Sequence, residues 1–332
     1  MGDVRIDRDH EVRALARAMG IRAREGLREA ITQRATDIVS TWLDEASITP
    51  ESLTDVHDLV LNRVSLRVER IGSDADLRLV SSKYATEMRG LPVQLSFEFE
   101  SDTEALVIKR PSAARRSASK FLAIIDARGG RRRRAWFSER HEAAHLVVPD
   151  PQTQMVMRRS GAPKKDPLEN VIDAVASRVG FWEPIVRPAL KKALASCPDI
   201  ISAFELVHRE LCRDASAEAA YRAFVHYIDE PLVLIRSSLQ SRAADRDDPA
   251  RSLALRATMV VFNDHAARIG LRVWPNYRIP NESIIRRAHM NSRSTLRDIE
   301  NLGSWPCETG RGLRNVAVNV AARGAWAALR PT

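Results

Sequence analysis

The sequence lacks several features that define large classes of protein. Its 332 residues include only three cysteines, which are Cys197, Cys212 and Cys307. Because they are odd in number and far apart, they indicate neither a disulfide framework nor a Cys-x-x-Cys zinc site, and they favour a reducing compartment. The longest apolar runs, such as residues 121–125, are far shorter than the roughly 20 residues of a transmembrane helix. Residues 1–10 contain no apolar signal-peptide core. We therefore expect a cytoplasmic protein without a membrane span.

The composition is that of an ordinary globular protein, but its charge is unevenly distributed. Hydrophobic residues make up 44% of the chain and charged residues 29%, which excludes wholesale disorder. Residues 101–140 contain 11 Lys and Arg against four Asp and Glu, and they carry most of the net charge of +9. Such a basic segment could bind an acidic protein or nucleic acid, although a solvated surface explains it equally well. Direct nucleic-acid binding is therefore not required by the sequence.

The first ninety residues have the apolar periodicity of helices. The pattern predicts four helices, at residues 10–19, 24–46, 52–71 and 75–88. Residues 1–100 carry 14 Lys and Arg against 18 Asp and Glu. This negative balance makes a DNA-binding bundle less favoured than a packing or partner-binding role. We interpret residues 1–90 as an N-terminal helical region.

The character of the chain changes after Gly90, where the period becomes that of strands. Residues 93–99 and 105–108 are predicted strands, and residues 121–137 a β-hairpin with a glycine-containing turn. The second hairpin strand contains Arg131, Arg132, Arg133 and Arg134, so it is expected to be an exposed edge. A short helix at residues 139–148, capped by Ser138, and a helix at residues 167–179 are expected next.

The remainder is predicted to be helical and then mixed. Helices are expected from residue 187 to about residue 239, followed by a charged linker at residues 241–248. A helix at residues 251–269, a short helix at 283–289 and a strand at 315–321 complete the chain. The expected fold class is α+β and predominantly helical. The chain is expected to divide into the regions 1–90, 91–240 and 241–332. The last region could act as a sensor or dock the substrate.

The chemistry of the chain is indicated by an H-E-x-x-H sequence on the predicted helix. His141 and His145 are four residues apart, so they project from the same helical face and can bind one Zn²⁺. Glu142 lies between them and can act as the general base toward a metal-bound water that attacks a peptide carbonyl. A solvent-facing pair of histidines is the alternative, but the apolar residues that follow indicate a helix at the edge of a core. The motif favours a zinc-dependent endopeptidase, with Mn²⁺ as a substitute in vitro.

A catalytic zinc site also needs a third protein ligand and an open position. Glu169, on the next predicted helix, is the preferred candidate, and Asp173 could hydrogen-bond a ligand histidine from the same face. Asp166 and Glu183 remain competing ligands. No third histidine completes the metzincin pattern, because residues 149–152 occupy its place.

These segments resemble the ImmA/IrrE family of gluzincin-like metallo-endopeptidases. The resemblance is carried by EALVI at residues 104–108, by the predicted hairpin and by FSERHEAAHLV at residues 137–147. It extends to Glu169, Asp173 and Ala176, which match the family's ligand helix. The chain departs from the family at residues 180–184, where GFWEP replaces the frequent Leu-Leu-Met-Pro. In all, the resemblance covers residues 93–184.

The resemblance implies a zincin-like core with a small antiparallel sheet and an active-site helix. It also implies regulatory proteolysis, because family members cleave a transcriptional repressor, often of the helix-turn-helix type. They do so after DNA damage or another stress, in bacteria, phages and mobile elements. A protein substrate of this kind is therefore the expected partner, and no membrane is expected to take part.

Two groups of residues are weaker candidates for supporting roles. The four arginines from Arg131 to Arg134 could dock an acidic substrate segment, or their edge strand could pair with the substrate backbone, although a charged edge also prevents aggregation. An oxyanion donor could come from His208, Tyr221, His226 or Tyr227 on the downstream helices. Each of these four side chains is individually more typical of a structural role.

Two other functions remain open at this level. The same fold could bind a repressor or DNA without cutting it, in which case Glu142 would have no task. Alternatively, the chain could be a defence or toxin-type protease that cuts several host proteins. The intact H-E-x-x-H favours catalysis over binding alone.

Overall fold

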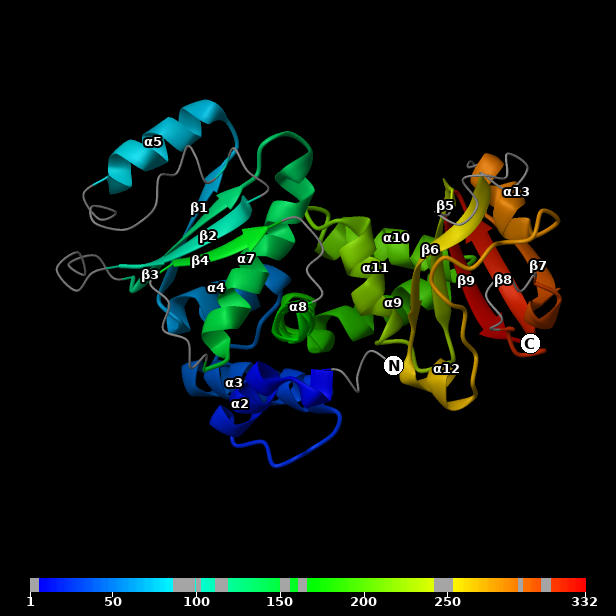
Figure 1. The fold of residues 1–332 in the computed structure, drawn as a ribbon, viewed down its shortest axis with the longest axis horizontal. Helices are drawn as coiled ribbons and strands as arrows, with labels where there is room; N and C mark the ends of the chain where they lie inside the picture. Colours follow the sequence, from blue (N-terminus) through cyan, green and yellow to red (C-terminus); the bar gives the residue numbers. More distant parts are fainter. Residues whose placement is uncertain are drawn as a thin grey trace. The chain divides into compact units, whose positions relative to one another are not determined.

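The protein is described here by a computed structural model that covers most of the chain. The described residues are 6–85, 99, 103–110, 119–149, 156–160 (backbone only), 166–241, 253–291, 295–305 and 312–332. They form two compact units (Figure 1). The first contains Met1–Ile185 and Cys212–Ala219, and the second contains Val186–Leu211 and Ala220–Thr332. The division into regions 1–90, 91–240 and 241–332 stays a prediction. The fold is a mixed α+β fold, as expected.

The first unit begins with the predicted helices. They are α2 (His10–Ala18), α3 (Leu27–Ala46), α4 (Leu53–Arg63) and α5 (Asp74–Tyr84). Asp9, Ser52 and Ser73 cap the first, third and fourth of these by accepting hydrogen bonds from backbone N–H groups. One prediction here is wrong, because the helix expected at residues 52–71 ends at Arg63 and Leu66–Ile71 forms strand β1. The register of β1 is set by strand β3, which is more than fifty residues away in the sequence.

The first unit contains a mixed four-stranded sheet with the order β1-β3-β2-β4. Its other strands are β2 (Thr103–Lys109), β3 (Phe121–Asp126) and β4 (Val156–Ser160). Strand β2 is antiparallel to β3 and β4, as the predicted small antiparallel sheet requires, but β1 is parallel to β3. Helix α5 packs on one face through Leu77, Val80 and Tyr84, and α7 lies against the opposite face (Figure 1). The strand predicted at residues 93–99 lies outside the described residues except for Phe99, which is not in a strand.

The predicted hairpin at residues 121–137 is wrong in its second half. After β3, a short 3-10 turn at Gly129–Arg131 leads directly into helix α7, Arg132–Val147. Arg132, Arg133 and Arg134 therefore lie in the first helical turn, and Ser138 is buried within the helix and does not cap it. The start of α7 is not predicted by the sequence because its first turn has no acidic residue and no capping side chain.

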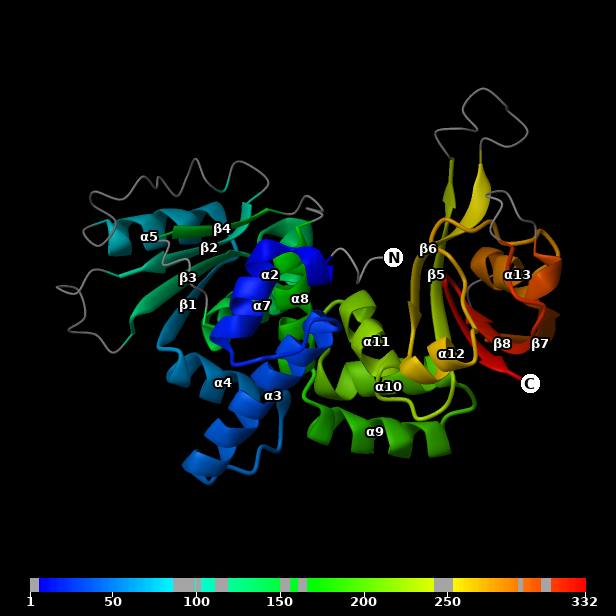
Figure 2. The ribbon, with the colours of Figure 1, turned by 60° about the horizontal axis from the view of Figure 1, so that its bottom comes forward.

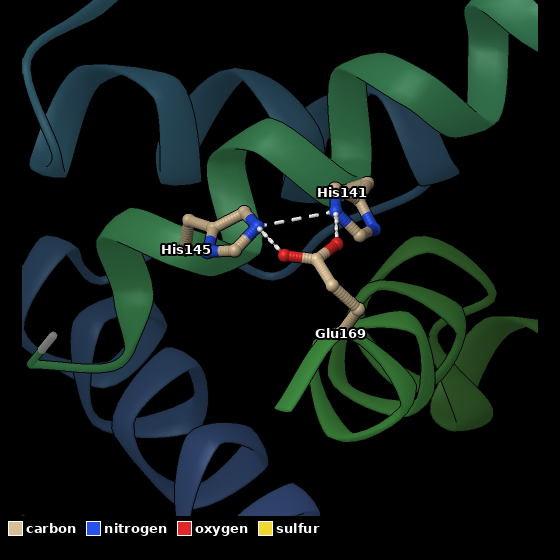
Figure 3. Close-up of side chains that lie close together, drawn as sticks. All are labelled: His141, His145 and Glu169. Atoms are coloured by element: carbon tan, nitrogen blue, oxygen red, sulfur yellow. Dashed lines mark hydrogen bonds and ion pairs between the residues drawn. The ribbon is translucent and has the colours of Figure 1, made fainter. Parts of the chain in front are cut away.

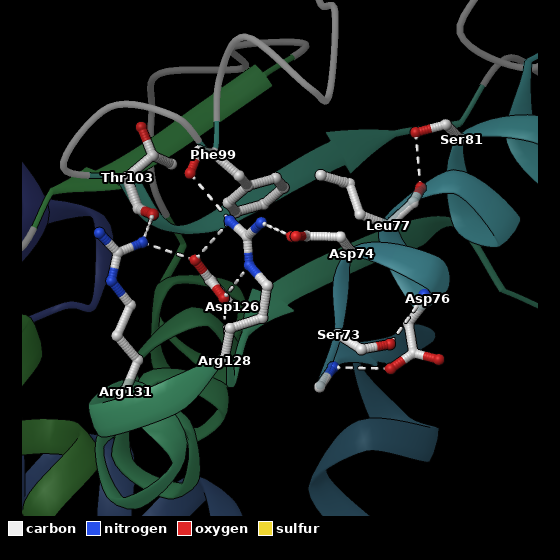
Figure 4. A network of polar contacts seen from close by, with 11 residues as sticks. Ser73, Asp74, Asp76, Leu77, Ser81, Phe99, Thr103, Asp126, Arg128 and Arg131 are labelled. Carbon is white, nitrogen blue, oxygen red and sulfur yellow. Dashed lines mark hydrogen bonds and ion pairs between the residues drawn. The ribbon is translucent and has the colours of Figure 1, made fainter.

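A buried carboxylate fixes the turn between β3 and α7 (Figure 4). Asp126 accepts hydrogen bonds from the backbone N–H and the guanidinium of Arg128, at 3.0 Å, and from Arg131 at 2.5 Å. Arg128 also donates to Asp74 and to the carbonyl of Phe99. Burial works to raise the pKa of Asp126, but the hydrogen bonds from Arg128 and Arg131 outweigh it and hold that pKa below its usual value.

We expect Asp126→Asn to destabilise the folded state by about 2 kcal/mol at neutral pH, since it removes charge-assisted hydrogen bonds. Because the folded-state pKa of Asp126 is depressed, its contribution is complete above the unfolded-state pKa of about 4. The contribution is lost as the pH falls through the folded-state value. Urea unfolding at several pH values should therefore show the difference between variant and wild type shrinking on acidification. Asp44→Asn, at an exposed position of α3, should show no such trend. A pH-independent difference for Asp126→Asn would contradict a depressed pKa for Asp126.

Helix α8 (Pro167–Gly180) packs beside α7 and has the start that the sequence predicts (Figure 2). Asp166 caps it by accepting a hydrogen bond from the N–H of Leu168, and Pro167 occupies the first turn. At its other end, Gly180 allows the side chain of Arg140 to cross closely. A Cβ on Gly180 would lie 2.7 Å from Cδ of Arg140. The two helices are thus held in close contact.

The second unit is built on a five-stranded antiparallel sheet with the order β6-β5-β9-β8-β7. Its strands are β5 (Val233–Gln240), β6 (Ala254–Phe262), β7 (Leu296–Asn301), β8 (Ala317–Arg323) and β9 (Trp326–Pro331). Its helices are α10 (Ile200–Leu211), α12 (Asp264–Arg268), α13 (Ile284–Met290) and most of α9 (Glu183–Ser196) and α11 (Ala217–Val225). The short helix and the strand predicted near 283–289 and 315–321 are confirmed by α13 and β8.

Two predictions in the second unit are wrong. Residues 233–239 belong to β5 although a helix was expected, and most of the helix predicted at 251–269 is strand β6 followed by the short α12. Each strand contains a short apolar run that suits either a buried strand or a buried helix, and their antiparallel pairing decides between the two. The predicted linker at residues 241–248 lies outside the described residues except for Ser241. None of the described helices has the length and apolar content to cross a bilayer.

Candidate metal centre

Helix α7 places two imidazole rings on one face, at the junction with α8 (Figure 3). His141 and His145 are buried, with 1% and 9% of their surfaces exposed. Their Nε2 atoms lie 3.1 Å apart, and their rings meet edge to face. This is the geometry expected for residues i and i+4 of a helix when both side chains turn toward one point.

Helix α8 brings a carboxylate to the same point. Oε2 of Glu169 lies 3.0 Å from Nε2 of His141, and Oε1 lies 3.4 Å from Nε2 of His145. One ligand atom from each of the three residues fits within a span of 4.8 Å. Among the described residues, they are the only such group of three histidine, cysteine or acidic side chains. The structure thus brings together the three residues that the sequence selects as ligands.

The donor set suits a small divalent cation. Two imidazole nitrogens and one carboxylate are the ligands of many catalytic zinc sites, and they leave a fourth position open. Both Nε2 atoms face the same carboxylate and each other, so a cation among them would satisfy all three groups at once. Burial works to raise the pKa of Glu169, but its contacts with His141 and His145 hold that pKa far below its usual value. Glu169 is therefore a carboxylate and available as a ligand.

Glu142 is a buried carboxylate beside this group. Only 2% of its surface is exposed, and Oε1 has no hydrogen-bond partner among the described residues. A buried polar atom without a partner is costly, and such atoms in folded proteins are usually explained by a water, an ion or a catalytic role. Its place on α7, next to His141, suits a group that would bind and deprotonate a water at the centre.

Asp173 holds the ring of His141 from the other side. Its Oδ1 lies 2.8 Å from Nδ1 of His141, one turn further along α8 than Glu169. A carboxylate at this distance favours a proton on Nδ1, which leaves the Nε2 lone pair free for a cation. Asp173 therefore lies where the sequence expects a residue that orients a ligand.

We expect Asp173→Ala to weaken zinc binding by about 10–100-fold, because His141 would lose the partner that fixes its tautomer and ring orientation. Competition with a chromogenic chelator measures this affinity directly. Asp173→Asn, which keeps an acceptor oxygen, should bind more tightly than the alanine variant. Asn170→Ala, at an exposed position of the same helix, is the matched control. An affinity equal to that of the wild type in Asp173→Ala would refute the orienting role.

The two competing ligands serve other purposes. Asp166 caps α8, and Glu183 lies 3.3 Å from Arg178. Neither belongs to the group of three. Glu169 is therefore the third ligand that the geometry favours.

The four arginines near α7 are arranged differently from the prediction. Arg131 pairs with Asp126, and Arg134 pairs with Glu104 at 2.8 Å. Arg132 and Arg133 are exposed. Because all four lie in a 3-10 turn or a helix, the expected edge strand that pairs with substrate is wrong there. Docking of an acidic substrate segment by these side chains stays a prediction.

The four candidate oxyanion donors lie in the second unit, in or just after α10 and α11. Tyr221 is 3% exposed and packs among Phe204, Phe224 and Trp326. His208 meets the ring of Tyr221 edge-on, and Tyr227 is buried while His226 is exposed. Their contacts are those of a packed core and its rim, and the catalytic role of any of them stays a prediction.

Sequence reasoning missed one charged group on the helix that presents the histidines. Glu139 on α7 is 2% exposed and forms a two-bonded ion pair with Arg70 of β1, while Nε2 of His57 on α4 lies 3.6 Å from its Oε2. Burial works to raise the pKa of Glu139, but the contacts with His57 and Arg70 hold it below its usual value. The signal available in the sequence was a glutamate two positions before His141, on a helix expected to be partly buried.

Comparison with known proteins adds nothing to this geometry. No family model matches the sequence, and no curated protein matches it. The side chains of the centre, and the resemblance of the sequence motifs to those of the ImmA/IrrE family, are therefore what indicates a function.

Proposed function

We propose that this protein is a zinc-dependent endopeptidase. The proposal is supported by the convergence of His141, His145 and Glu169, and by the buried Glu142 on the same helix, whose Oε1 has no hydrogen-bond partner among the described residues. A site that only bound a cation would have no use for the additional buried carboxyl group of Glu142. An endopeptidase in which a metal-bound water attacks the peptide needs such a group, because a base must remove a proton from that water.

Each residue would have a distinct task. His141, His145 and Glu169 would hold zinc, which when bound supplies a Lewis acid for the peptide carbonyl and for water. Glu142 would accept the proton of the attacking water at Oε1 and deliver it to the leaving amine nitrogen. Asp173 would keep His141 in the tautomer that presents Nε2. The burial of Glu142 would strengthen its interaction with the water and exclude competing solvent.

The substrate class follows from the resemblance to the ImmA/IrrE family. We propose that the chain cleaves a regulatory protein, and specifically a helix-turn-helix transcriptional repressor. Cleavage would release the genes under that repressor during a stress, DNA-damage or mobile-element response. In this proposal the protein acts in the cytoplasm, where such repressors are found.

The proposal is tested by exposing the zinc-loaded protein to a library of peptides derived from a bacterial proteome. Mass spectrometry of newly formed N-termini should reveal cleavage at a narrow set of sites, and a chelator should suppress it. Cleavage at many unrelated sites would favour a defence or toxin-type protease. Binding of a repressor or DNA by a zinc-loaded protein that cuts none of the library or the repressor would favour the non-catalytic regulator.

A further inference from the structure

An ion pair with a buried carboxylate lies on the far side of the helix that presents the two histidines. Glu139 accepts two hydrogen bonds from the guanidinium of Arg70, one from Nε and one from Nη2 at 2.8 Å. Nε2 of His57 on α4 lies 3.6 Å from the second carboxylate oxygen and has no hydrogen-bond partner among the described residues. We call these three residues the Arg70–Glu139–His57 cluster. Its ion pair joins α7 to β1, and His57 places α4 next to the same carboxylate.

The cluster is close to the metal ligands along the helix but opposite to them around it. Glu139 is two positions before His141, which corresponds to about 200° of rotation and about 3 Å of rise in an α-helix. His141 is bonded to α8 through Asp173 and Glu169. Helix α7 is thus held on one face by α8 and on the opposite face by β1 and α4. Rotation of α7 about its axis would stretch both sets of contacts.

The charged side chains of the cluster are better explained by a need to fix the orientation of α7 than by a gain in folding stability. The carboxylate of Glu139 is 2% exposed, whereas the side chain of Arg70 is 62% exposed. Removing a carboxylate from water costs free energy that an ion pair only partly returns, and apolar residues often stabilise such a position as well or better. A two-bonded guanidinium–carboxylate pair, however, fixes direction as well as distance. Apolar packing does not impose a preferred rotation on a helix in this way.

We propose that Arg70, acting through Glu139, positions α7 so that His141 and His145 face Glu169 at the spacing that a zinc ion requires. The inference rests on the proposed function, since it assigns a purpose to the ion pair only if zinc binds. Arg70 and Glu139 are positioning residues that do not touch the metal or the substrate. Their substitution should therefore change the metal site itself in protein that remains folded.

The test measures zinc affinity and the absorption spectrum of the Co²⁺-substituted protein, which reports ligand geometry. The variants are Arg70→Met, Arg70→Lys and Glu139→Gln in the full chain, each studied well below its unfolding temperature. We expect Arg70→Met and Glu139→Gln to bind zinc about 10–100-fold more weakly, the size of effect seen when groups that orient metal ligands are removed. Their Co²⁺ spectra should also differ from that of the wild type. Arg70→Lys keeps the charge but loses the paired geometry, so its affinity should fall between those of Arg70→Met and the wild type.

Two controls separate positioning from general destabilisation. Arg67→Met removes an ion pair with Glu69 on the same strand, and it should leave zinc affinity unchanged. Val56→Ala creates a small cavity in α4, where Val56 is 1% exposed, so it should lower the unfolding temperature without changing the Co²⁺ spectrum. If Val56→Ala weakened zinc binding as much as Arg70→Met, the effect would be one of stability and the positioning role would be refuted.

The outcomes also distinguish this inference from the proposed function. A wild type that binds zinc, with wild-type affinity and spectrum in folded Arg70→Met and Glu139→Gln, overturns the positioning role alone. A folded wild type that binds no zinc overturns both. Wild-type zinc affinity and a wild-type Co²⁺ spectrum in Arg70→Lys would show that a positive charge at this position is sufficient. This result would overturn the role of the two-bonded geometry.

Discussion

Replacing Glu142 with glutamine should abolish peptide hydrolysis while leaving the zinc content unchanged. Glutamine has the same shape as glutamate but cannot accept a proton from water at neutral pH. Loss of a general base reduces the rate of catalysis by about 10²–10⁴-fold. The loss should appear in kcat, because the base acts in the chemical step. Initial rates on a cleaved peptide from the library, with metal content measured on the same samples, provide the comparison.

The same variant should remain folded, which separates a catalytic role from a structural one. Oε1 of Glu142 has no hydrogen-bond partner in the described part of the chain, so the substitution breaks no hydrogen bond to that atom within these residues. It also removes a buried negative charge, so the unfolding temperature without metal should not fall. Glu25→Gln, at an exposed position, is the matched control and should keep full activity. Retention of most of the hydrolysis in Glu142→Gln would exclude Glu142 as the base.

Removing one ligand of the centre should have an equally large effect on metal binding. Elemental analysis of the wild type should find about one zinc ion per chain, because one group of three ligands converges in the described structure. His141→Ala and Glu169→Ala should each lose it, with an affinity loss greater than the roughly 10–100-fold effect of altering a neighbour of a ligand. Mn²⁺ should replace zinc in vitro at the same site and be lost in the same variants.

The pair of substitutions is informative because the two ligands come from different helices. His10→Ala, at an exposed position of α2, should keep the metal and controls for the loss of a histidine alone. Loss of zinc in His141→Ala but not in Glu169→Ala would show that a residue other than Glu169 is the third ligand. A folded wild type without metal, even after zinc is added, would end the protease proposal.

The candidate centre was largely predictable because its main motif is local. The spacing of His141 and His145 determines that both rings share a face of any helix that contains them. Glu169 and Asp173 follow the same rule on the next helix, whose start is marked by Asp166 and Pro167. Propensity and capping are short-range effects, so these helices can be predicted without knowing what packs against them.

The wrong secondary-structure predictions concern segments whose local structure is decided by contacts with residues outside the segment. Residues 66–71 continue an apolar pattern that suits a helix, yet their backbone hydrogen bonds go to β3. Residues 131–137 lack every usual sign of a helix start, and the turn before them is fixed by Asp126, Arg128 and Arg131. In the second unit, β5 and β6 are strands because they pair with each other.

The sequence by itself determined the chemistry of this protein, that is, which side chains could bind a cation and which could act as a base. It did so because His141, Glu142 and His145 lie within five residues of one helix, whose geometry fixes the relative direction of their side chains. Only the tertiary structure decided that α8 meets α7 with Glu169 opposite both histidines, that Asp173 reaches Nδ1 of His141, and that Arg70 reaches Glu139 from the other side. These contacts join residues 24 to 69 positions apart in the chain, and packing, which no short-range pattern records, brings them together.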